Sequence, residues 1–373
     1  MKPRSYAAML AVVAVLAAGA FLASDQGAPL SDADAPYDSG NIHWNLTEGV
    51  LTLTLNGAGG TYMEDYGYGD APWYDCRLYI AEVVVGRGIT SIGDGAFYDC
   101  RALSSVVVPG SVASIGDGAF ASCYNLSSVV ISDGVRAIGD SAFFDCHALS
   151  SVVIPGSVTS IGDGAFVDCN ALSSVVISDG VVSIGGSAFA SCYNLSSVVI
   201  PGSVKTIGDC AFTSCYSLSS VVISKGVTSI GDGAFNYCET LRNILFEGST
   251  PPKLGYGSFD LAGESGFATE AYVRSSIWTS QEVLETVFTR EVIGDSVVKY
   301  GGGVGDPPNS PSGPAGADWK YEWSSGTLTF FGTTFPDRGE WASIRPCVRH
   351  VVIGEGIDSI GIAAFSGAAP SPP

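Results

Sequence analysis

The chain has 373 residues, enough for two or three domains, and carries 37 acidic against 17 basic side chains, a formal net charge of −20. Nucleic-acid binding depends on Lys and Arg at phosphates, so this charge argues against it and favours a soluble surface that attracts cations. Histidines occur only at His43, His147 and His350, which leaves little material for a histidine-based metal site.

Residues 1–23 have the pattern of a secretory signal peptide. Lys2 and Arg4 precede an apolar run from Ala7 to Ala23, and small residues at its end suit cleavage. The alternative is an uncleaved membrane anchor, because ~17 apolar residues lie at the lower limit for spanning a bilayer. Either way we expect the rest of the chain to be exported, and any membrane contact to involve only this segment. Three Asn-x-Ser/Thr sequons fit export: Asn45, Asn125 and Asn194.

The next two segments lead into a repetitive region. Residues 24–40 are rich in Asp, Ala and Pro, which predicts disorder. Residues 41–81 do not repeat and contain an alternating strand over 50–55, followed by Gly-rich and aromatic stretches through Pro72-Trp73. A repeat array needs end pieces that cover its open faces, and 41–81 stand where an N-terminal cap belongs.

Residues 82–247 are built from a 23-residue repeat. The phrase Ile-Gly-x-x-Ala-Phe recurs seven times without insertion, with its phenylalanines at Phe97, Phe120, Phe143, Phe166, Phe189, Phe212 and Phe235. A unit this short cannot bury its own apolar face, so it is stable only when stacked on its neighbours. The period therefore predicts a solenoid and argues against a globular enzyme.

One unit, read from Leu149, shows the expected layout. Leu149, Val152 and Ile154 follow the L-x-x-L-x-L strand pattern of leucine-rich repeats. The Gly-Asp-Gly that follows predicts a short helical or 3₁₀ turn through Ala-Phe-x-x-Cys. The other inward residues are expected to be Val158, Ile161, Ala165 and Phe166. The fold class is a β-rich solenoid of about seven units, each a short parallel strand plus a turn or 3₁₀ segment, with terminal caps.

Alternate units differ, so a 46-residue period lies over the 23-residue one. Pro109, Pro155 and Pro201 begin Pro-Gly-Ser-Val turns, whereas Ser132, Ser178 and Ser224 begin Ser-Asp/Lys-Gly-Val turns. Residues 121–131 and 190–200 are identical, which indicates duplication of a block of units.

After residue 247 the period is lost. Residues 248–300 are predicted to be a C-terminal cap, and residues 301–318 a flexible Gly/Pro linker. Residues 319–373 then begin the lead-in again: a shift of 268 aligns Val83 with Val351 and Phe97 with Phe365. We expect this second cap and partial repeat to be marginally ordered, because a cap without repeats has little to pack against, and the reading frame to be truncated relative to a longer ancestor.

The repeat Ser-Val-x-Ile-Pro-x-x-Val-x-x-Ile-Gly-x-x-Ala-Phe-x-x-Cys-x-x-Leu resembles the BspA-like, or Treponema-type, leucine-rich repeat family over residues 80–247. The position after the strand holds Ser157 or Gly134 in place of the usual Asn or Cys, so the asparagine ladder of the wider class is not carried over. The resemblance implies a secreted or surface protein of a microbe, implicated in adhesion to host or matrix proteins and to other cells.

Equivalent residues should stack ~5 Å apart, so each column acts as one feature. The cysteine column comprises Cys100, Cys123, Cys146, Cys169, Cys192, Cys215 and Cys238. A linear column does not make a closed zinc site, and an odd count cannot pair fully in disulfides, although adjacent rungs are within reach. We interpret these residues as buried free thiols beside the phenylalanines, a structural ladder. Cys210, which replaces Gly at a turn, is expected to be the most reactive thiol.

A column of aspartates occupies the Gly-Asp-Gly turns: Asp94, Asp117, Asp140, Asp163, Asp209 and Asp232, interrupted by Gly186. Hard cations such as calcium need several oxygen ligands, and one carboxylate per rung is sparse for that purpose. We interpret the column as N-caps, each accepting an otherwise unpaired backbone N–H at its own turn. No metal or cofactor is predicted.

Two surfaces are candidates for binding. The concave face of the strands is monotonous and uncharged, suited to a repetitive ligand or to another copy of the chain, or merely to sheet formation. Its central residues are Ser151, Val153, Ser174, Val176, Ser197 and Val199, and it continues through Ser105/Val107, Ser128/Val130 and Ser220/Val222.

The second surface lies just beyond the Phe and Cys columns, where the units vary. We name it the contact row: Arg101, Tyr124, His147, Asn170, Tyr193, Tyr216 and Glu239. Its tyrosines and arginine are residue types that dominate binding hot spots, although tolerated edge variation would look the same. A neighbouring variable column holds Tyr98, Phe144, Val167, Thr213 and Asn236.

Catalytic signatures are lacking: the sequence has no Gly-x-Ser-x-Gly, His-Glu-x-x-His, Walker or dinucleotide motif. The sequence therefore predicts a secreted or cell-surface, non-catalytic binding protein that mediates adhesion to an extracellular protein or glycan. The alternatives are a self-associating structural component of a surface layer or biofilm, and a non-catalytic targeting module of a once larger enzyme.

Overall fold

The computed structural model describes residues 37–57, 59–248, 250–261, 270–275, 287–293, 297–300, 319–322, 327–330 and 350–353. The predicted signal peptide, the linker 301–318 and most of the segment 24–40 lie outside the described residues. Within the described parts of the chain, no helix has the length and apolarity needed to cross a membrane.

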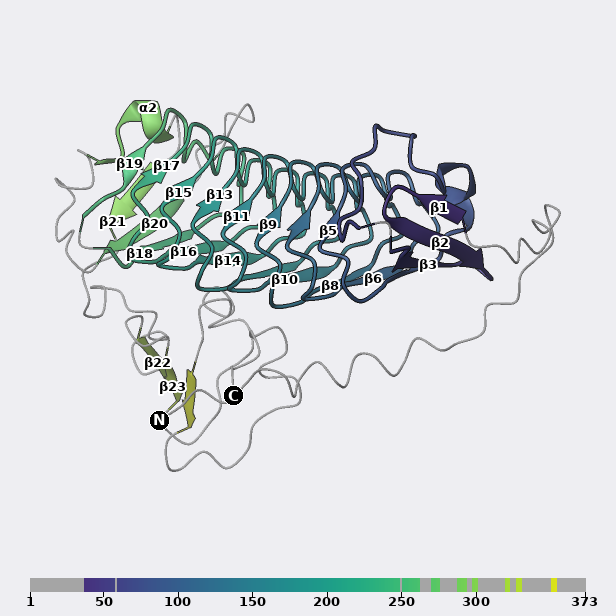
Figure 1. The fold of residues 1–373 in the computed structure, drawn as a ribbon. Coiled ribbons are helices and arrows are strands. Elements are labelled where there is room, and N and C mark those ends of the chain that lie inside the picture. Colours follow the sequence, from purple (N-terminus) through teal and green to yellow (C-terminus); the bar gives the residue numbers. More distant parts are fainter. Residues whose placement is uncertain are drawn as a thin grey trace. The chain divides into compact units, whose positions relative to one another are not determined.

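A ladder of four-residue parallel strands forms one side of the solenoid (Figure 1). Where neighbouring strands of the repeat pair, the paired residues are 23 positions apart, for example Ser151 and Ser174. Within each strand, burial alternates because neighbouring side chains point to opposite faces, so Val152 and Ile154 enter the core while Ser151 and Val153 remain exposed. The strands are β4 (Glu82–Val85), β6 (Ser105–Val108), β8 (Ser128–Ile131), β10 (Ser151–Ile154), β12 (Ser174–Ile177), β14 (Ser197–Ile200), β16 (Ser220–Ile223) and β18 (Asn243–Phe246).

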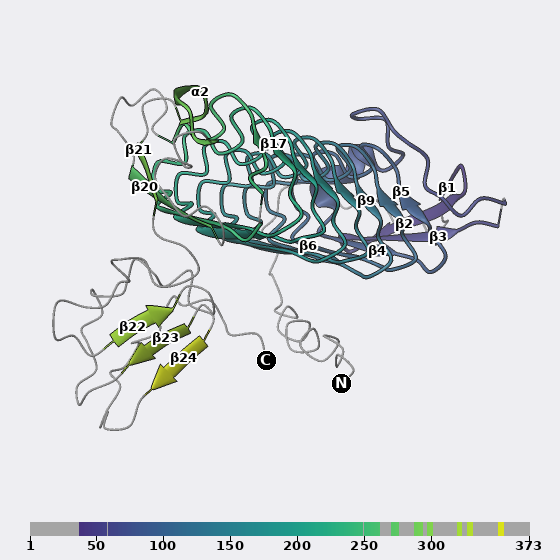
Figure 2. The same ribbon diagram turned by 90° about the vertical axis from the view of Figure 1, so that its left-hand side faces the viewer.

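A second, narrower parallel sheet runs along the opposite side of each coil (Figure 2). Its two-residue strands place the Ile of every Ile-Gly pair in the core, as at Ile161. They are β5 (Ser91–Ile92), β7 (Ser114–Ile115), β9 (Ala137–Ile138), β11 (Ser160–Ile161), β13 (Ser183–Ile184), β15 (Thr206–Ile207), β17 (Ser229–Ile230) and β19 (Lys253–Leu254).

The seven repeat phenylalanines form one continuous pile inside the solenoid. Their rings are fully buried, and successive centroids lie 5.0–5.2 Å apart with nearly parallel planes. This separation is set by the strand spacing, since each ring advances with its coil. The predicted β-solenoid of about seven 23-residue units is confirmed.

The coils continue past the point where the sequence period ends. Phe259 stacks on Phe235 at 5.0 Å, and β19 pairs with β17 although their residues are 24 rather than 23 apart. Strand β20 (Glu270–Ser275) extends the main ladder from β18. The residues after 247, predicted to be a cap, therefore begin with another coil, because backbone pairing and ring stacking tolerate the inserted residue.

At the other end, the lead-in supplies an antiparallel hairpin. β2 (Ile42–Thr47) pairs with β3 (Val50–Leu55), and β3 then pairs in parallel with β4. β1 (Tyr37–Ser39) adds an edge strand to β2, so the sheet starts inside the segment 24–40 that was predicted to be disordered. A 3₁₀ helix, η2 (Tyr74–Tyr79), follows Trp73.

In the described repeat units, the Ala-Phe-x-x-Cys segments form hydrogen-bonded turns, which is the turn alternative of the prediction and not the 3₁₀ or helical one. The reason lies in where alternate N–H groups donate. Tyr98 donates to Gly95 within the turn, whereas Phe97 and Asp99 donate to Ala119 and Ala121 of the next coil. A helix would need every N–H to bond within its own coil.

The main ladder is interrupted at two places, each next to a proline of the 46-residue period. β10 pairs with β12 over four residues and β14 with β16 likewise, but no pairing joins β8 to β10 or β12 to β14. Ser178 donates its N–H to Ile154, whereas Pro155 has no N–H to donate to Ile131. At these two places a strand that is followed by proline meets the strand before it, whereas β6, which is followed by Pro109, still pairs with β4 over two residues.

The remaining described elements are short. β21 (Val297–Tyr300) pairs with β20, and α2 (Arg290–Ile293) lies between them in sequence. Farther along the chain, β22 (Trp319–Glu322), β23 (Thr327–Phe330) and β24 (His350–Ile353) form a separate three-stranded sheet.

Candidate functional site

The cysteine column is a buried hydrogen-bonded ladder. All seven thiols are free and almost completely buried. The Sγ of Cys169 donates to the carbonyl oxygen of Phe143 at 3.3 Å, and the contact repeats from Cys123 to Cys238. Burial raises the pKa of every column thiol, to about 12 for Cys215. These thiols therefore contribute to structure rather than to chemistry.

Cys210 lies outside this column. Its side chain is partly exposed, as the sequence predicted, and its backbone has a φ of 55° because it replaces a glycine. Burial, with the charges of Asp209 and Asp232, raises the pKa of its thiol. A raised pKa lowers the thiolate fraction of Cys210, but its partial exposure leaves this thiol more accessible than the buried column thiols. That Cys210 is the most reactive thiol stays a prediction.

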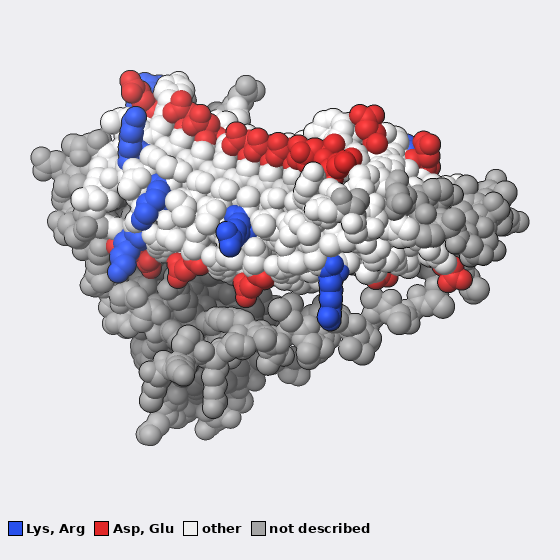
Figure 3. Space-filling view, in the orientation of Figure 1, with Lys and Arg blue, Asp and Glu red and all other residues white. Residues whose placement is uncertain are grey.

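The aspartates accept hydrogen bonds from the next coil rather than from their own turn. The Oδ1 of Asp140 accepts from the N–H of Asp163 at 2.7 Å, and the pattern holds along the column from Asp65 to Tyr256. The N-capping interpretation is thus wrong in its geometry, because no helix begins at these turns. Each carboxylate still accepts a backbone N–H, but that N–H belongs to the next coil. Gly186 interrupts the column, so no carboxylate at that position accepts the N–H of Asp209. Figure 3 shows acidic side chains gathered in a row along one edge of the solenoid.

The outward Ser/Val face is exposed and apolar at its valines. Val107, Val153, Val176 and Val199 are 56%, 55%, 50% and 47% exposed. Ser151 and Ser174 between them are also exposed, whereas Ser220 at the C-terminal end is buried. The face carries no charged side chain from β6 to β16.

The first half of the contact row is joined by direct contacts. The guanidinium of Arg101 lies 5.0 Å from the ring centroid of Tyr124, whose other neighbour is the imidazole of His147, stacked at 5.1 Å and 8°. The Nδ1 of His147 lies 3.2 Å from the amide nitrogen of Asn170 and 3.0 Å from the carbonyl oxygen of Asp168. Four successive coils are thus linked through side chains.

The second half repeats the arrangement with tyrosines. Tyr193 and Tyr216 stack at 5.1 Å and 12°, and they are 38% and 44% exposed. Glu239 follows on the next coil and is exposed. The structure therefore brings the row residues into one strip. Sequence analysis predicted the strip but not the stacking, which depends on side-chain rotamers.

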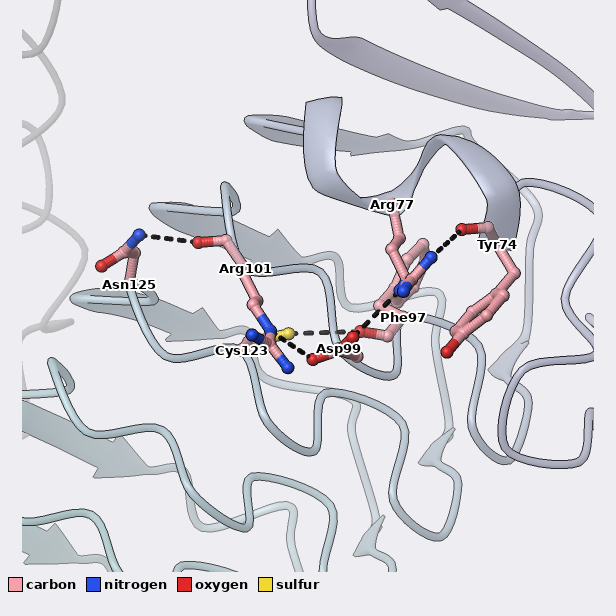
Figure 4. Close-up of polar contacts among 7 residues, drawn as sticks. All are labelled: Tyr74, Arg77, Phe97, Asp99, Arg101, Cys123 and Asn125. Atoms are coloured by element: carbon pink, nitrogen blue, oxygen red, sulfur yellow. Dashed lines mark hydrogen bonds and ion pairs between the residues drawn. The ribbon is translucent and has the colours of Figure 1, made fainter.

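One ion-pair cluster was missed from the sequence. Asp99 accepts hydrogen bonds from the Nε of Arg77 at 3.0 Å and the Nε of Arg101 at 2.6 Å (Figure 4). Burial alone would raise the pKa of Asp99, but the bonds and charges of Arg101 and Arg77 together lower it. The cluster joins η2 to the start of the contact row and holds Arg101 over Tyr124. Nothing in the repeat identified it, since Arg77 lies in the non-repeating lead-in.

The neighbouring variable column is less exposed. Tyr98, Phe144, Val167, Thr213 and Asn236 are all only partly exposed, and Tyr98 packs against Tyr68 with ring centroids 4.6 Å apart. In the described residues, no three His, Cys, Asp or Glu side chains are grouped closely enough to hold a metal ion.

The family model described as BspA type leucine rich repeat region matches residues 69–173 and 136–261, which together span more than half of the chain. No curated protein matches the sequence significantly.

Several solved structures are similar. A leucine-rich repeat protein from Eubacterium ventriosum is 26% identical, with 70% of this chain and 83% of that one covered and a TM-score of 0.38. The T. pallidum leucine rich repeat protein is 27% identical, with 60% and 87% covered and a TM-score of 0.38. A leucine rich cell surface protein from Faecalibacterium prausnitzii is 19% identical, with 92% and 100% covered and a TM-score of 0.43. On the family match, the chain belongs to the BspA type leucine rich repeat family.

Proposed function

We propose that this protein is an exported, non-catalytic binding protein that holds an extracellular protein or glycan along its contact row. One observation carries the proposal: side chains that differ from coil to coil lie in one strip of exposed and partly exposed residues on an otherwise uniform scaffold. Tyr124 contacts both Arg101 and His147, and Tyr193 stacks on Tyr216.

The composition of this strip supports recognition of one specific partner. Binding energy concentrates in a few aromatic and Arg anchors, and the row supplies three tyrosines and an arginine. Stacking within the row fixes these rings before a partner arrives, which lowers the entropy lost on binding. The ring faces of Tyr193 and Tyr216 already contact each other, so a partner meets ring edges and hydroxyl groups.

The acidic and the basic residue of the row stand at its opposite ends. Arg101 stands at one end, held by Asp99, and Glu239 stands at the other. A partner with an acidic group near Arg101 and a basic group near Glu239 would bind along the row in one orientation only. Export follows from the signal-like residues 1–23, and the self-repelling charge of −20 suits a soluble extracellular surface.

The test is retention of the full chain on immobilised extracellular-matrix proteins and on arrayed polysaccharides. Binding to one of them should weaken at least about tenfold when Tyr193→Ala and Tyr216→Ala are combined, the loss expected for removal of two anchors. The matched control is Ser174→Ala with Val176→Thr on the Ser/Val face, which should bind like the parent. Equal loss in both variants, or no retention on any surface, would contradict the proposal.

A second candidate function is self-association through the Ser/Val face. Half-exposed valines on successive strands, with no charge between them, form a strip that could pack against the same strip of another copy. Light scattering as a function of concentration tests this idea, with Val153→Lys and Val176→Lys as the variant. A parent chain that stays monomeric at high concentration would exclude self-association through this face.

A further inference from the structure

Two guanidinium groups share one carboxylate where the N-terminal cap meets the array. The Oδ2 of Asp99 accepts from the Nε of Arg77, and its Oδ1 accepts from the Nε of Arg101 (Figure 4). Among the described residues, Asp99 is also the only carboxylate that raises the pKa of either guanidinium. Two positive charges therefore face one negative charge here, on a chain whose net charge is −20.

Most of the N–H groups of Arg101 are free to bind a ligand. A guanidinium has five N–H donors, and within the described part of the chain only the Nε of Arg101 donates to an acceptor. The side chain is 55% exposed, and its position is fixed by Asp99 on one side and by the ring of Tyr124 on the other. Such a guanidinium binds a carboxylate group through two parallel hydrogen bonds.

The sign of the charge changes farther along the contact row. Asp145 and Asp168 occupy, two and three coils on, the position that Asp99 has in its own unit, and both are partly exposed. Burial raises the pKa of Asp145, His147 lowers it, and the charge of Asp168 raises it, so these two carboxylates are close enough to repel each other. A ligand with a negative charge on every unit would meet this repulsion, whereas a ligand with one negative charge at its end would not.

The spacing of the row fits a chain of sugars better than an extended peptide. Successive rings lie 5.1 Å apart, both from Tyr124 to His147 and from Tyr193 to Tyr216. Side chains on one face of an extended peptide lie about 6.8 Å apart, twice the rise per residue, and soon lose register with such a row. One pyranose ring with its glycosidic oxygen has a length close to that of one coil, so successive sugars meet successive row residues.

We propose that the contact row binds an oligosaccharide that is neutral except for one acidic sugar at its end, whose carboxylate lies on the guanidinium of Arg101. This inference rests on the binding role proposed above and narrows its ligand to one chemical class. Arg77 neutralises Asp99, so that Arg101 keeps its charge for the ligand. The neutral sugars then follow the row, and their hydroxyl groups bond to the phenol of Tyr124 and the imidazole of His147.

The test is isothermal titration of the full chain with matched oligosaccharides. The first pair is lactose capped by N-acetylneuraminic acid and the methyl ester of the same trisaccharide, which keeps the shape but removes the charge. The acid should bind at least about tenfold more tightly than the ester, because a charged bidentate contact is lost. A second pair, a cellotriose ending in glucuronate and cellotriose itself, distinguishes the two common sources of a terminal carboxylate.

Substitutions locate the contact. Arg101→Gln should abolish the preference for the acid over the ester, and Arg77→Gln should reduce it at least about threefold, since Asp99 then neutralises Arg101. Arg136→Gln removes the same charge from an exposed arginine outside the row and should leave the preference unchanged. Circular dichroism checks that each variant is folded.

A polyanion provides an independent measurement. Polygalacturonate carries a carboxylate on every sugar, and combining Asp145→Asn with Asp168→Asn should raise its affinity at least about threefold, because two repelling charges are removed.

The outcomes separate this inference from the binding role itself. Equal binding of acid and ester in both pairs, a preference that survives Arg101→Gln, or equally tight binding of an acidic decapeptide would overturn the inference. If a matrix protein or glycan is retained through Tyr193 and Tyr216 without any preference for the acid, the binding role stands and only the acidic end group is wrong. No retention on any surface would overturn both.

Discussion

The indole ring of Trp73 stacks on the phenyl ring of Phe97 with centroids 5.8 Å apart and planes inclined by 22°. The indole N–H also donates to the carbonyl oxygen of Ala96 at 2.7 Å. Trp73 therefore covers the open end of the phenylalanine pile, and Trp44 and Tyr66 pack edge-on against its ring. The cap begins the pile rather than merely lying over it.

Replacing Trp73 should detach the cap from the array. Trp73→Ala should lower the free energy of unfolding by about 3–5 kcal/mol, because a large buried ring is removed. Trp73→Phe should cost about 1–2 kcal/mol, since it keeps the stack but loses the bond to Ala96. Urea unfolding followed by fluorescence and circular dichroism measures both. Equal costs for the two variants would show that ring stacking contributes nothing.

A proline placed directly after β12 should weaken the pairing of β12 with β10. Ser178→Pro removes the N–H that donates to Ile154 and should cost about 1 kcal/mol, with β10 and β12 becoming unpaired as β8 and β10 are. Ser178→Ala keeps the N–H and should change stability by less than about 0.5 kcal/mol. The midpoint of urea unfolding distinguishes them, and a Pro variant as stable as the Ala variant would contradict the account of the interruptions.

The gap in the aspartate ladder can be filled. Gly186→Asp places a carboxylate where it can accept from the N–H of Asp209, and should stabilise the protein by about 0.5–1 kcal/mol in moderate salt. The added Cβ would lie 3.3 Å from the carbonyl oxygen of Asp209, so only a small shift is needed. Asp140→Ala should destabilise by a similar amount, and Asp140→Asn, which keeps an acceptor, should be nearly neutral. Thermal unfolding checks all three, and destabilisation by Gly186→Asp would refute this role.

Alkaline pH should unfold the protein through its buried thiols. Burial raises the pKa of Cys100 and Cys215 to about 12, from an ordinary 9.0, so the folded state keeps protons that the unfolded state releases. Stability is then fully present below about pH 9 and falls as pH rises toward 12, by about 1.4 kcal/mol per pH unit for each thiol. Unfolding free energies between pH 7 and 11 measure the slope. Combining Cys146→Ala, Cys169→Ala and Cys192→Ala should flatten it, and an unchanged slope would exclude the thiols as its cause.

The same burial should protect the column from alkylation. Iodoacetamide at neutral pH should label Cys76 and Cys210, both partly exposed, well before any of the seven column cysteines. Mass spectrometry of peptides, before and after denaturation, reports the order. Early labelling of Cys146, or its recovery in a disulfide with Cys123 or Cys169, would contradict a reduced and closed ladder.

The sequence by itself determined the solenoid, because a 23-residue unit with one strand and one buried phenylalanine has no other way to cover its apolar side. The ladder of Phe143 on Phe166 and the burial of Cys169 follow from that period alone. The contact row also came from the sequence, since it is where one unit differs from the next.

The tertiary structure decided what the period does not encode. Trp73 and Phe259 extend the pile of phenylalanine rings from non-repeating segments. A ring stacks wherever the fold places it over the last ring of the pile, whatever the number of residues between the two in sequence. Asp140 bonds to the next coil rather than to its own turn, because alternate N–H groups of each turn point toward the neighbouring coil. These hydrogen-bond partners depend on how the coils stack in three dimensions. The repeat pattern in the sequence does not show whether a backbone N–H faces its own coil or the neighbouring one.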